Sequence, residues 1–240
     1  RGQLGHNSVK EEYTPRICAL LRKAGAEQIC CGDDHTLILL NNGHLFVMGA
    51  NHCGQLGLGD TVDRGVPTPV IAFVDEHIAD VAASHNGSLA LTNAGIVFTF
   101  GNSEIEVGCR LPRHVYTLPK ADPIVSIAKD ASFDYAVSDT GNLFRWPASD
   151  TNWDGDGKTE TESFHAIKGV LRIYTGQNHV AVICTSDMGC TQAMISRDKS
   201  SSFSNDISKA SLEKFPEEST QTPMSAVAGR MSVQAGAHCL

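Results

Sequence analysis

A strand–turn–strand unit recurs about every fifty residues, and this period constrains the fold more than any other feature of the sequence. In each unit, two runs rich in β-branched and aromatic residues flank a central glycine. The central glycines, Gly43, Gly95 and Gly141, lie 52 and then 46 residues apart. Glycine accepts the positive φ of a tight two-residue turn, so each unit is predicted to be a β-hairpin. The matching segments are residues 37–49, 89–101 and 135–146.

A second motif follows the same period and places a turn after a short run that begins with valine or isoleucine. Its turn positions are 52, 46, 46 and 60 residues apart, and they are Gly32, Ser84, Asp130, Gly176 and Gly236. Three copies carry a histidine after the turn, at His35, His179 and His238. An enzyme does not need one catalytic residue per repeat. These histidines are therefore predicted to make a repeated internal hydrogen bond that fixes the turn.

A third motif is a glycine-rich loop. The segment Gly54-Gln-Leu-Gly-Leu-Gly-Asp60 matches Gly2-Gln-Leu-Gly5, which lies 52 residues earlier. Such glycines are typical of tight turns and of backbone packed close to a neighbour. A nucleotide-binding loop is the alternative, but the Lys-Ser/Thr pair of a P-loop is missing and no helical pattern follows. The loop is therefore predicted to be structural.

The order of these motifs resembles the repeat of the regulator of chromosome condensation family. The clearest copy runs from Gly43 to Leu91 and contains Gly49-Ala-Asn51 before the glycine-rich loop. The resemblance implies an all-β fold, a β-propeller of four-stranded antiparallel blades with seven blades in a complete ring. About four blades and part of a fifth are expected here. The predicted structural signature consists of Gly2, Gln3, Leu4, Gly5, Gly32, His35, Gly43, Gly49, Asn51, Gly54, Gln55, Leu56, Gly57, Gly59, Asp60, Gly95, Gly101, Gly141, Gly176, His179, Gly236 and His238.

The repeats are interrupted once. Residues 197–222 are polar with scattered apolar positions, which predicts a flexible insertion. Propeller blades are expected over residues 1–196, the first of them incomplete, and the start of a further blade over residues 223–240. Because the repeats are cut at both ends, we expect the sequence to be a piece of a longer protein.

Composition narrows the classes of function. The formal net charge is −8, which argues against a nucleic-acid partner, since such proteins carry a surplus of Lys and Arg. The sequence has no run of 18 apolar residues, so no membrane span is predicted. Eight scattered cysteines without a C-x-x-C pair predict buried thiols in a reducing compartment, which favours a cytoplasmic or nuclear protein.

Candidate chemistry is sparse, and no cofactor or catalytic set is predicted. The segment Asp150-x-Asn152-x-Asp154-Gly155 begins like a calcium loop, but its twelfth position is Thr161 instead of a bidentate glutamate. No metal site is therefore predicted. A Ser-His-Asp set and a paired-carboxylate motif are likewise not evident.

These observations favour a binding module that holds a protein partner. The resemblance implies propellers that bind GTPases, chromatin or ubiquitin-ligase partners, and a small GTPase is the candidate partner. Two alternatives stay open: a guanine-nucleotide exchange factor for a Ran-like small GTPase, and the regulatory propeller of a ubiquitin ligase. Functional residues specific to this protein are expected in the segments that the repeats do not share, namely 102–114, 147–165 and 197–222.

Overall fold

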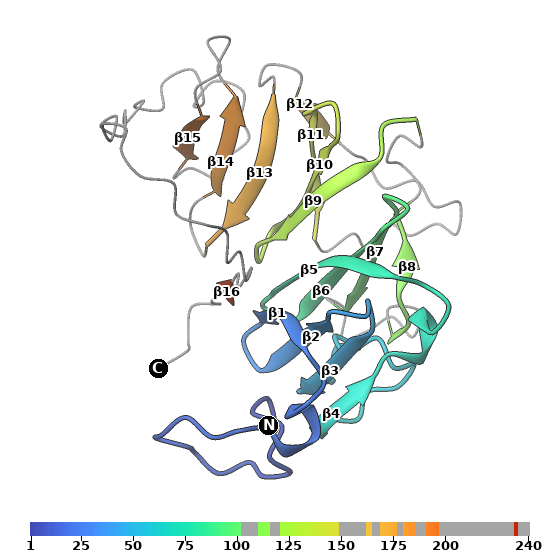
Figure 1. Ribbon diagram of the computed structural model, residues 1–240, viewed down its shortest axis with the longest axis vertical. Coiled ribbons are helices and arrows are strands. Elements are labelled where there is room, and N and C mark those ends of the chain that lie inside the picture. The colour runs from blue at the N-terminus through green and yellow to red at the C-terminus, as the bar shows by residue number, and fades with distance from the viewer. Residues whose placement is uncertain are drawn as a thin grey trace.

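Within the residues that it describes, the computed structural model has four β-sheets and almost no helix (Figure 1). It describes residues 1–101, 110–115, 121–148, 162–164, 169–176, 180–185, 191–196 and 233–234. The predicted all-β propeller is confirmed, because the described strands of each sheet, apart from β16, follow one another along the chain and pair antiparallel. Each sheet forms one blade. Among the described residues, no helix is long and apolar enough to cross a membrane.

Blades 1 and 2 are complete. Blade 1 consists of β1 (Ala26–Cys31), β2 (His35–Leu40), β3 (Leu45–Gly49) and β4 (Arg64–Pro69). Blade 2 consists of β5 (Ile78–Ser84), β6 (Gly87–Thr92), β7 (Val97–Gly101) and β8 (Arg113–His114). Two short 3₁₀ turns, η1 (Ala19–Leu21) and η2 (Ile71–Phe73), precede the first strands of these blades.

Blade 3 also has four strands, and blade 4 has three among the described residues. Blade 3 consists of β9 (Ile124–Lys129), β10 (Phe133–Ser138), β11 (Leu143–Pro147) and β12 (Glu162–Phe164). Blade 4 consists of β13 (Val170–Thr175), β14 (Val180–Thr185) and β15 (Thr191–Ser196).

The C-terminal boundaries stay predictions. The expected insertion at 197–222 lies outside the described residues, and only β16 (Val233–Gln234) is described from the expected further blade at 223–240. This strand pairs parallel with β1, and Val233 lies opposite Ile29.

The predicted hairpins join the second and third strands of blades 1 to 3. In blade 1, Gly43 has a φ of +79° and its backbone N–H donates to Leu40 O at 2.9 Å. A Cβ at this position would lie 2.4 Å from His77 Nδ1, so the glycine is required by its backbone conformation and by its neighbour. Gly95 and Gly141 take the same conformation, with φ of +77° and +83°.

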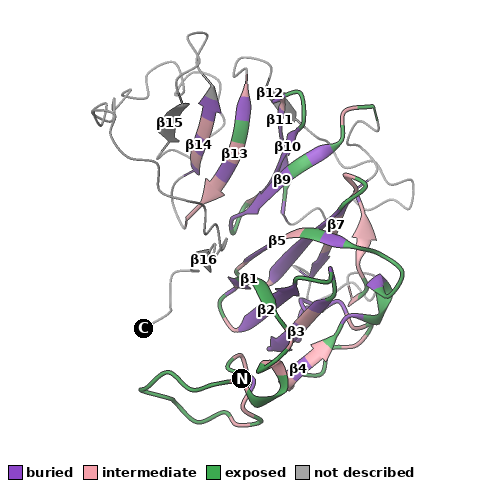
Figure 2. Ribbon diagram, in the orientation of Figure 1, coloured by how far each residue is buried: buried purple, intermediate pink, exposed green. Residues whose placement is uncertain are grey.

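The hydrophobic core lies between blades. One cluster joins Leu37 and Val47 of blade 1 to Val81 and Phe100 of blade 2, and similar clusters join blades 2 and 3 and blades 3 and 4. Both β2 and β6 are buried along their whole length instead of alternating (Figure 2). Blade 2 packs between blades 1 and 3, and the second face of β2 is covered by Leu21 and Ala24. Burial between neighbours positions every blade against the next one.

The innermost strands are linked by side chains as well as by packing. Gln28 on β1 donates through Nε2 to Asp80 Oδ1 at 2.8 Å and to Val81 O at 3.0 Å on β5. Asp80 in turn accepts a hydrogen bond from the backbone of Ile127 on β9 at 3.4 Å. These bonds connect strands of adjacent blades that do not share a sheet.

Candidate functional site

The glycine-rich loops hold each blade to the next one. Thr36 Oγ1 on β2 donates to Gln3 O at 2.9 Å, and Ser88 Oγ on β6 donates to Gln55 O at 2.8 Å. Both pairs are 33 residues apart, so the same contact is made twice, one repeat later. The Gln55 loop leaves blade 1 after β3 and bonds to blade 2. The two glutamines of the predicted signature therefore serve as inter-blade contacts.

Asn51 holds the second glycine-rich loop in shape. Its Nδ2 donates to Asp60 O at 2.9 Å and to Asp60 Oδ1 at 3.0 Å, while its Oδ1 accepts from Leu56 N at 3.0 Å. The Leu56 side chain is fully buried in the cluster between blades 1 and 2. Gly57, with a φ of +66°, packs against the Phe100 ring, where a Cβ would lie 2.9 Å from the nearest ring carbon.

His35 also connects two blades. Its Nε2 lies 2.9 Å from Ser88 Oγ, and the side chain is 1 % exposed. The side-chain bond crosses to blade 2, while the turn itself is closed by Gly32 N, which donates to His35 O at 2.9 Å. Burial and the nearby Lys129 charge lower the pKa of His35 to about 3, so the imidazole is neutral at physiological pH. A Cβ at position 32 would lie 2.1 Å from His35 Cε1, which explains the glycine there.

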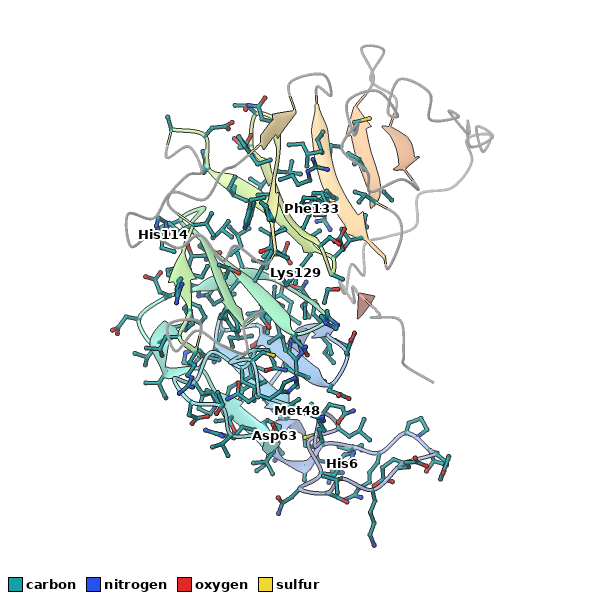
Figure 3. The ribbon with its side chains drawn as sticks, turned by 180° about the vertical axis from the view of Figure 1, so that it is seen from behind. His6, Met48, Asp63, His114, Lys129 and Phe133 are labelled. Carbon is teal, nitrogen blue, oxygen red and sulfur yellow. The ribbon has the colours of Figure 1, made fainter. Side chains whose placement is uncertain are left out.

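Blade 3 replaces this neutral contact with a buried ion pair. At the boundary between blades 2 and 3, Asp134 stands at the repeat position that Ser88 has in blade 2. The histidine that would contact it is missing, because blade 2 has Gly87 at the repeat position of His35. Lys129 Nζ lies 2.5 Å from Asp134 Oδ1, and the two side chains are 0 % and 1 % exposed. Burial raises the pKa of Asp134, and the Lys129 charge opposes that rise. Figure 3 labels Lys129 near the centre of the molecule.

Asp130 stabilises the turn between β9 and β10 of blade 3. Its Oδ1 accepts from Ser132 N at 2.6 Å and from Phe133 N at 2.9 Å, and its Oδ2 accepts from the Tyr135 hydroxyl at 3.1 Å. Because Phe133 replaces the histidine, position 130 no longer faces an imidazole ring and accepts a side chain.

The exposed side chains at this end form a charged surface, which we call the loop end. His85 Nδ1 lies 2.7 Å from Asp33 Oδ2, Arg1 Nε lies 3.5 Å from Asp34 Oδ2, and Arg1 also contacts His52. The surface thus carries two carboxylates, Asp33 and Asp34, in contact with His85 and Arg1. These contacts span the turns of blades 1 and 2, which the buried signature residues hold in place.

His85 carries backbone strain at the loop end. Its φ is +47°, in the left-handed region that bulky residues seldom adopt. The residue sits in the two-residue turn between β5 and β6, where Asp33 N donates to its carbonyl at 3.2 Å. Strained residues of this kind persist where surrounding contacts fix them, and they gather at functional surfaces.

The described residues hold no group of three or more metal-ligating side chains. Cys18 and Cys30 are free thiols. Burial raises the pKa of the Cys30 thiol, which makes it a poor nucleophile.

Parts of the predicted site cannot be placed. His179, Gly236 and His238 lie outside the described residues, as do 102–109, 149–161, 165 and 197–222 of the unshared segments. Of the first unshared segment, Arg110 to His114 is described, and Gly59 N donates to Arg110 O at 2.8 Å. Sequence reasoning missed the pairs Asp33–His85 and Lys129–Asp134, because only departures from the repeat mark those positions.

Two family models match the chain, and both describe the same repeat. The model for the regulator of chromosome condensation (RCC1) repeat matches residues 1–39 and 42–91, and a second model of the same repeat matches residues 26–55.

Curated relatives share the repeat over most of the chain. The human E3 ubiquitin-protein ligase HERC2 is 27 % identical over 202 residues, covering 78 % of this chain and 4 % of that protein. The ultraviolet-B receptor UVR8 of Arabidopsis thaliana is 38 % identical over 183 residues, covering 73 % of this chain and 42 % of the receptor. A shorter match, 37 % identical over 111 residues, is to the human X-linked retinitis pigmentosa GTPase regulator. This chain thus spans less than half the length of these relatives.

Solved structures show the same fold. Human WBSCR16 superposes with a TM-score of 0.64 at 22 % identity, covering 80 % of this chain and 54 % of that structure. Prp20p of Saccharomyces cerevisiae, solved in a study of its binding to Gsp1p and histones, gives 0.60 at 22 % identity, covering 78 % and 48 %.

Proposed function

Because this chain belongs to the regulator of chromosome condensation repeat family, we propose that it is a protein-binding propeller whose loop end recognises a small GTPase. A propeller offers turns on a rigid frame, so a binding surface can vary without a change in the core. The proposal concerns the loop end of blades 1 and 2, with Asp33, Asp34 and His85 as the contact residues.

The observation that carries the proposal is that, at one end of the blades, some residues bond one blade to the next while others stay exposed. Gln3, Gln55 and His35 are occupied by inter-blade bonds, whereas Asp33 and His85 remain exposed on the turns that those bonds fix. Rigid, charged and exposed groups suit recognition because little order must be gained on binding.

The charge of the loop end indicates the chemistry of the partner. Asp33 and Asp34 favour a basic surface, and their attraction would accelerate association at low salt. The acidic net charge of the chain, −8, disfavours nucleic acid as that partner. The match to a protein named a GTPase regulator supports a GTPase as the partner class.

Exchange activity is the second candidate function. It is supported by the family resemblance. A nucleotide-release assay separates it from simple binding: faster release of labelled GDP from one GTPase would establish exchange, and stable capture without faster release would exclude exchange for that GTPase.

The match to HERC2 supports a third candidate function, the regulatory propeller of a ubiquitin ligase. A cytoplasmic or nuclear location is proposed with each of these functions.

The binding proposal is tested by charge reversal. The double variant Asp33→Lys, Asp34→Lys should weaken binding to the recognised GTPase at least about tenfold, the loss expected when close charge pairs become repulsive. The matched control is Asp75→Lys, Glu76→Lys, which reverses two exposed carboxylates beside η2, outside the loop end. Equal affinity of the loop-end variant and the wild type would overturn the assignment of this surface.

A further inference from the structure

The first strands of the four blades share a β-bulge at one repeat position. These strands, β1, β5, β9 and β13, lie side by side, one from each blade (Figure 1). Near its start, each of them has one residue more than the strand with which it pairs, and the extra residues, all exposed, are Glu27, Ala79, Val125 and Leu171. A bulge bends its strand and changes the direction of the neighbouring side chain, and bulges are frequent beside binding and active sites.

The residues that follow the four bulges differ in chemistry, although their positions are equivalent. They stand 52, 46 and 46 residues apart, and they are Gln28, Asp80, Ser126 and Arg172. All four line one hollow of about 100 Å³. An amide, a carboxylate, a hydroxyl and a guanidinium group thus border a single small space. The repeat supplies the frame of this hollow, and the differences between blades supply its chemistry.

Two of these four side chains have no protein partner among the described residues. Ser126 is only 8 % exposed, yet its hydroxyl makes no hydrogen bond within the described part of the chain, whereas buried hydroxyls normally have a partner. Arg172 is half-buried, and no described residue forms a hydrogen bond or an ion pair with its guanidinium group. A planar guanidinium beside a free hydroxyl suits a carboxylate, because both can donate to its oxygens.

The other side of the hollow is acidic. Asp80 Oδ1 accepts from Gln28 Nε2 at 2.8 Å and from Val81 N at 2.9 Å, whereas Oδ2 accepts from Ile127 N over a long 3.4 Å. Oδ2 therefore retains capacity to accept a further hydrogen bond. Burial raises the pKa of Asp80, so a bound cation would stabilise the charged carboxylate. Glu27, an exposed carboxylate, lines the same hollow.

The volume of the hollow limits the size of its ligand. A cavity of about 150 Å³ holds a benzene molecule, so about 100 Å³ suits a molecule of about five heavy atoms, such as glycine. We propose that the hollow binds a small α-amino acid, with the carboxylate on Arg172 and Ser126 and the ammonium group on Asp80.

This site is separate from the surface proposed to bind a GTPase. The hollow lies near the starts of the four first strands, whereas the loop end lies beyond the end of β1, at Asp33 and Asp34. Amino-acid binding and GTPase binding can therefore be tested independently on the same protein.

Titration of the isotope-labelled 240-residue protein with glycine, followed by NMR, tests the proposal. Glycine should shift the amide signals of β1, β5, β9 and β13. Acetate and methylamine carry one charge each and should bind at least about tenfold more weakly. Arg172→Gln should weaken glycine binding by a similar factor, and Ser126→Ala should weaken it less. Arg22→Gln is the matched control, at an exposed arginine outside the hollow, and it should bind glycine like the wild type.

The spectrum of each variant without glycine shows whether the variant is folded. If Arg172→Gln unfolds, Asp80→Asn removes the opposite charge and should weaken glycine binding to a similar extent. The double variant Asp33→Lys, Asp34→Lys should bind glycine normally, even if it loses a GTPase. A wild type that does not respond to glycine or L-alanine at about 10 mM would overturn the proposal. Acetate binding as tightly as glycine would overturn it as well, because the hollow would then recognise an anion alone.

Discussion

His35 Nε2 and Ser88 Oγ lie 2.9 Å apart across the boundary between blades 1 and 2, and both side chains are buried. The Ser88 hydroxyl donates its own proton to Gln55 O, so three segments meet at one polar point inside an apolar interface. Buried polar groups stabilise a fold only when they are paired. This point therefore fixes how the two blades meet.

A double-mutant cycle on His35→Ala and Ser88→Ala measures that contact. His35→Ala should lower the free energy of unfolding by about 3 kcal/mol, because it leaves a cavity and breaks a hydrogen bond. The coupling energy from urea unfolding should be about 1 kcal/mol. Additive effects of the two substitutions would show that the contact contributes nothing of its own.

Titration of His35 should make stability depend on pH. The unfolded imidazole takes up a proton near pH 6.5, whereas the folded one does so only near pH 3. Stability from this residue is present above pH 6.5 and is lost as the pH falls from 6.5 towards 3, by about 1.4 kcal/mol per pH unit. Urea unfolding of the wild type and of His35→Gln between pH 7 and pH 4 should show a shallower slope for the variant. Equal slopes would contradict a buried, neutral His35.

The Lys129–Asp134 pair should tolerate loss of both charges better than loss of one. Lys129→Ala leaves a buried carboxylate without its partner and should cost about 3–5 kcal/mol. The double variant Lys129→Ala, Asp134→Ser restores the residues that blade 2 has at these positions, Ala83 and Ser88. It should recover most of the loss in thermal or urea unfolding. A double variant less stable than Lys129→Ala would contradict the view that this pair replaces the His–Ser contact.

Replacing His85 should weaken partner binding without lowering the stability of the fold. Replacement by glycine relieves the strain of a φ of +47° and should leave the free energy of unfolding unchanged or raise it by about 1 kcal/mol. The same change removes the contact with Asp33 and should weaken capture of the GTPase partner. Asn42→Gly, in the exposed turn between β2 and β3, is the control for the effect of an added glycine. Marked destabilisation by His85→Gly would show that the histidine is structural.

The repeat made most of the fold predictable. Turn glycines and flanking apolar runs recur at fixed spacing, so the hairpins at Gly43, Gly95 and Gly141 follow from local rules. The partner of His35 did not follow, because it belongs to the next blade and only the tertiary packing brings Ser88 to it. The Lys129–Asp134 pair was hidden for the same reason, since the two residues look like unrelated departures from the repeat.

The loop end was harder to predict than the frame. Asp33 and His85 are 52 residues apart and occupy the same repeat position, yet their side chains differ in charge. Such differences are not part of the repeat motif, although they determine the chemistry of the surface that a partner contacts.

Binding to a panel of purified small GTPases, measured by interferometry, tests the central claim most directly. The wild type should capture at least one member, Asp33→Lys with Asp34→Lys should bind that member at least about tenfold more weakly, and Asp75→Lys with Glu76→Lys should bind it like the wild type. Failure of the wild type to bind any member, or undiminished binding by the loop-end variant, would contradict recognition of a small GTPase through the loop end.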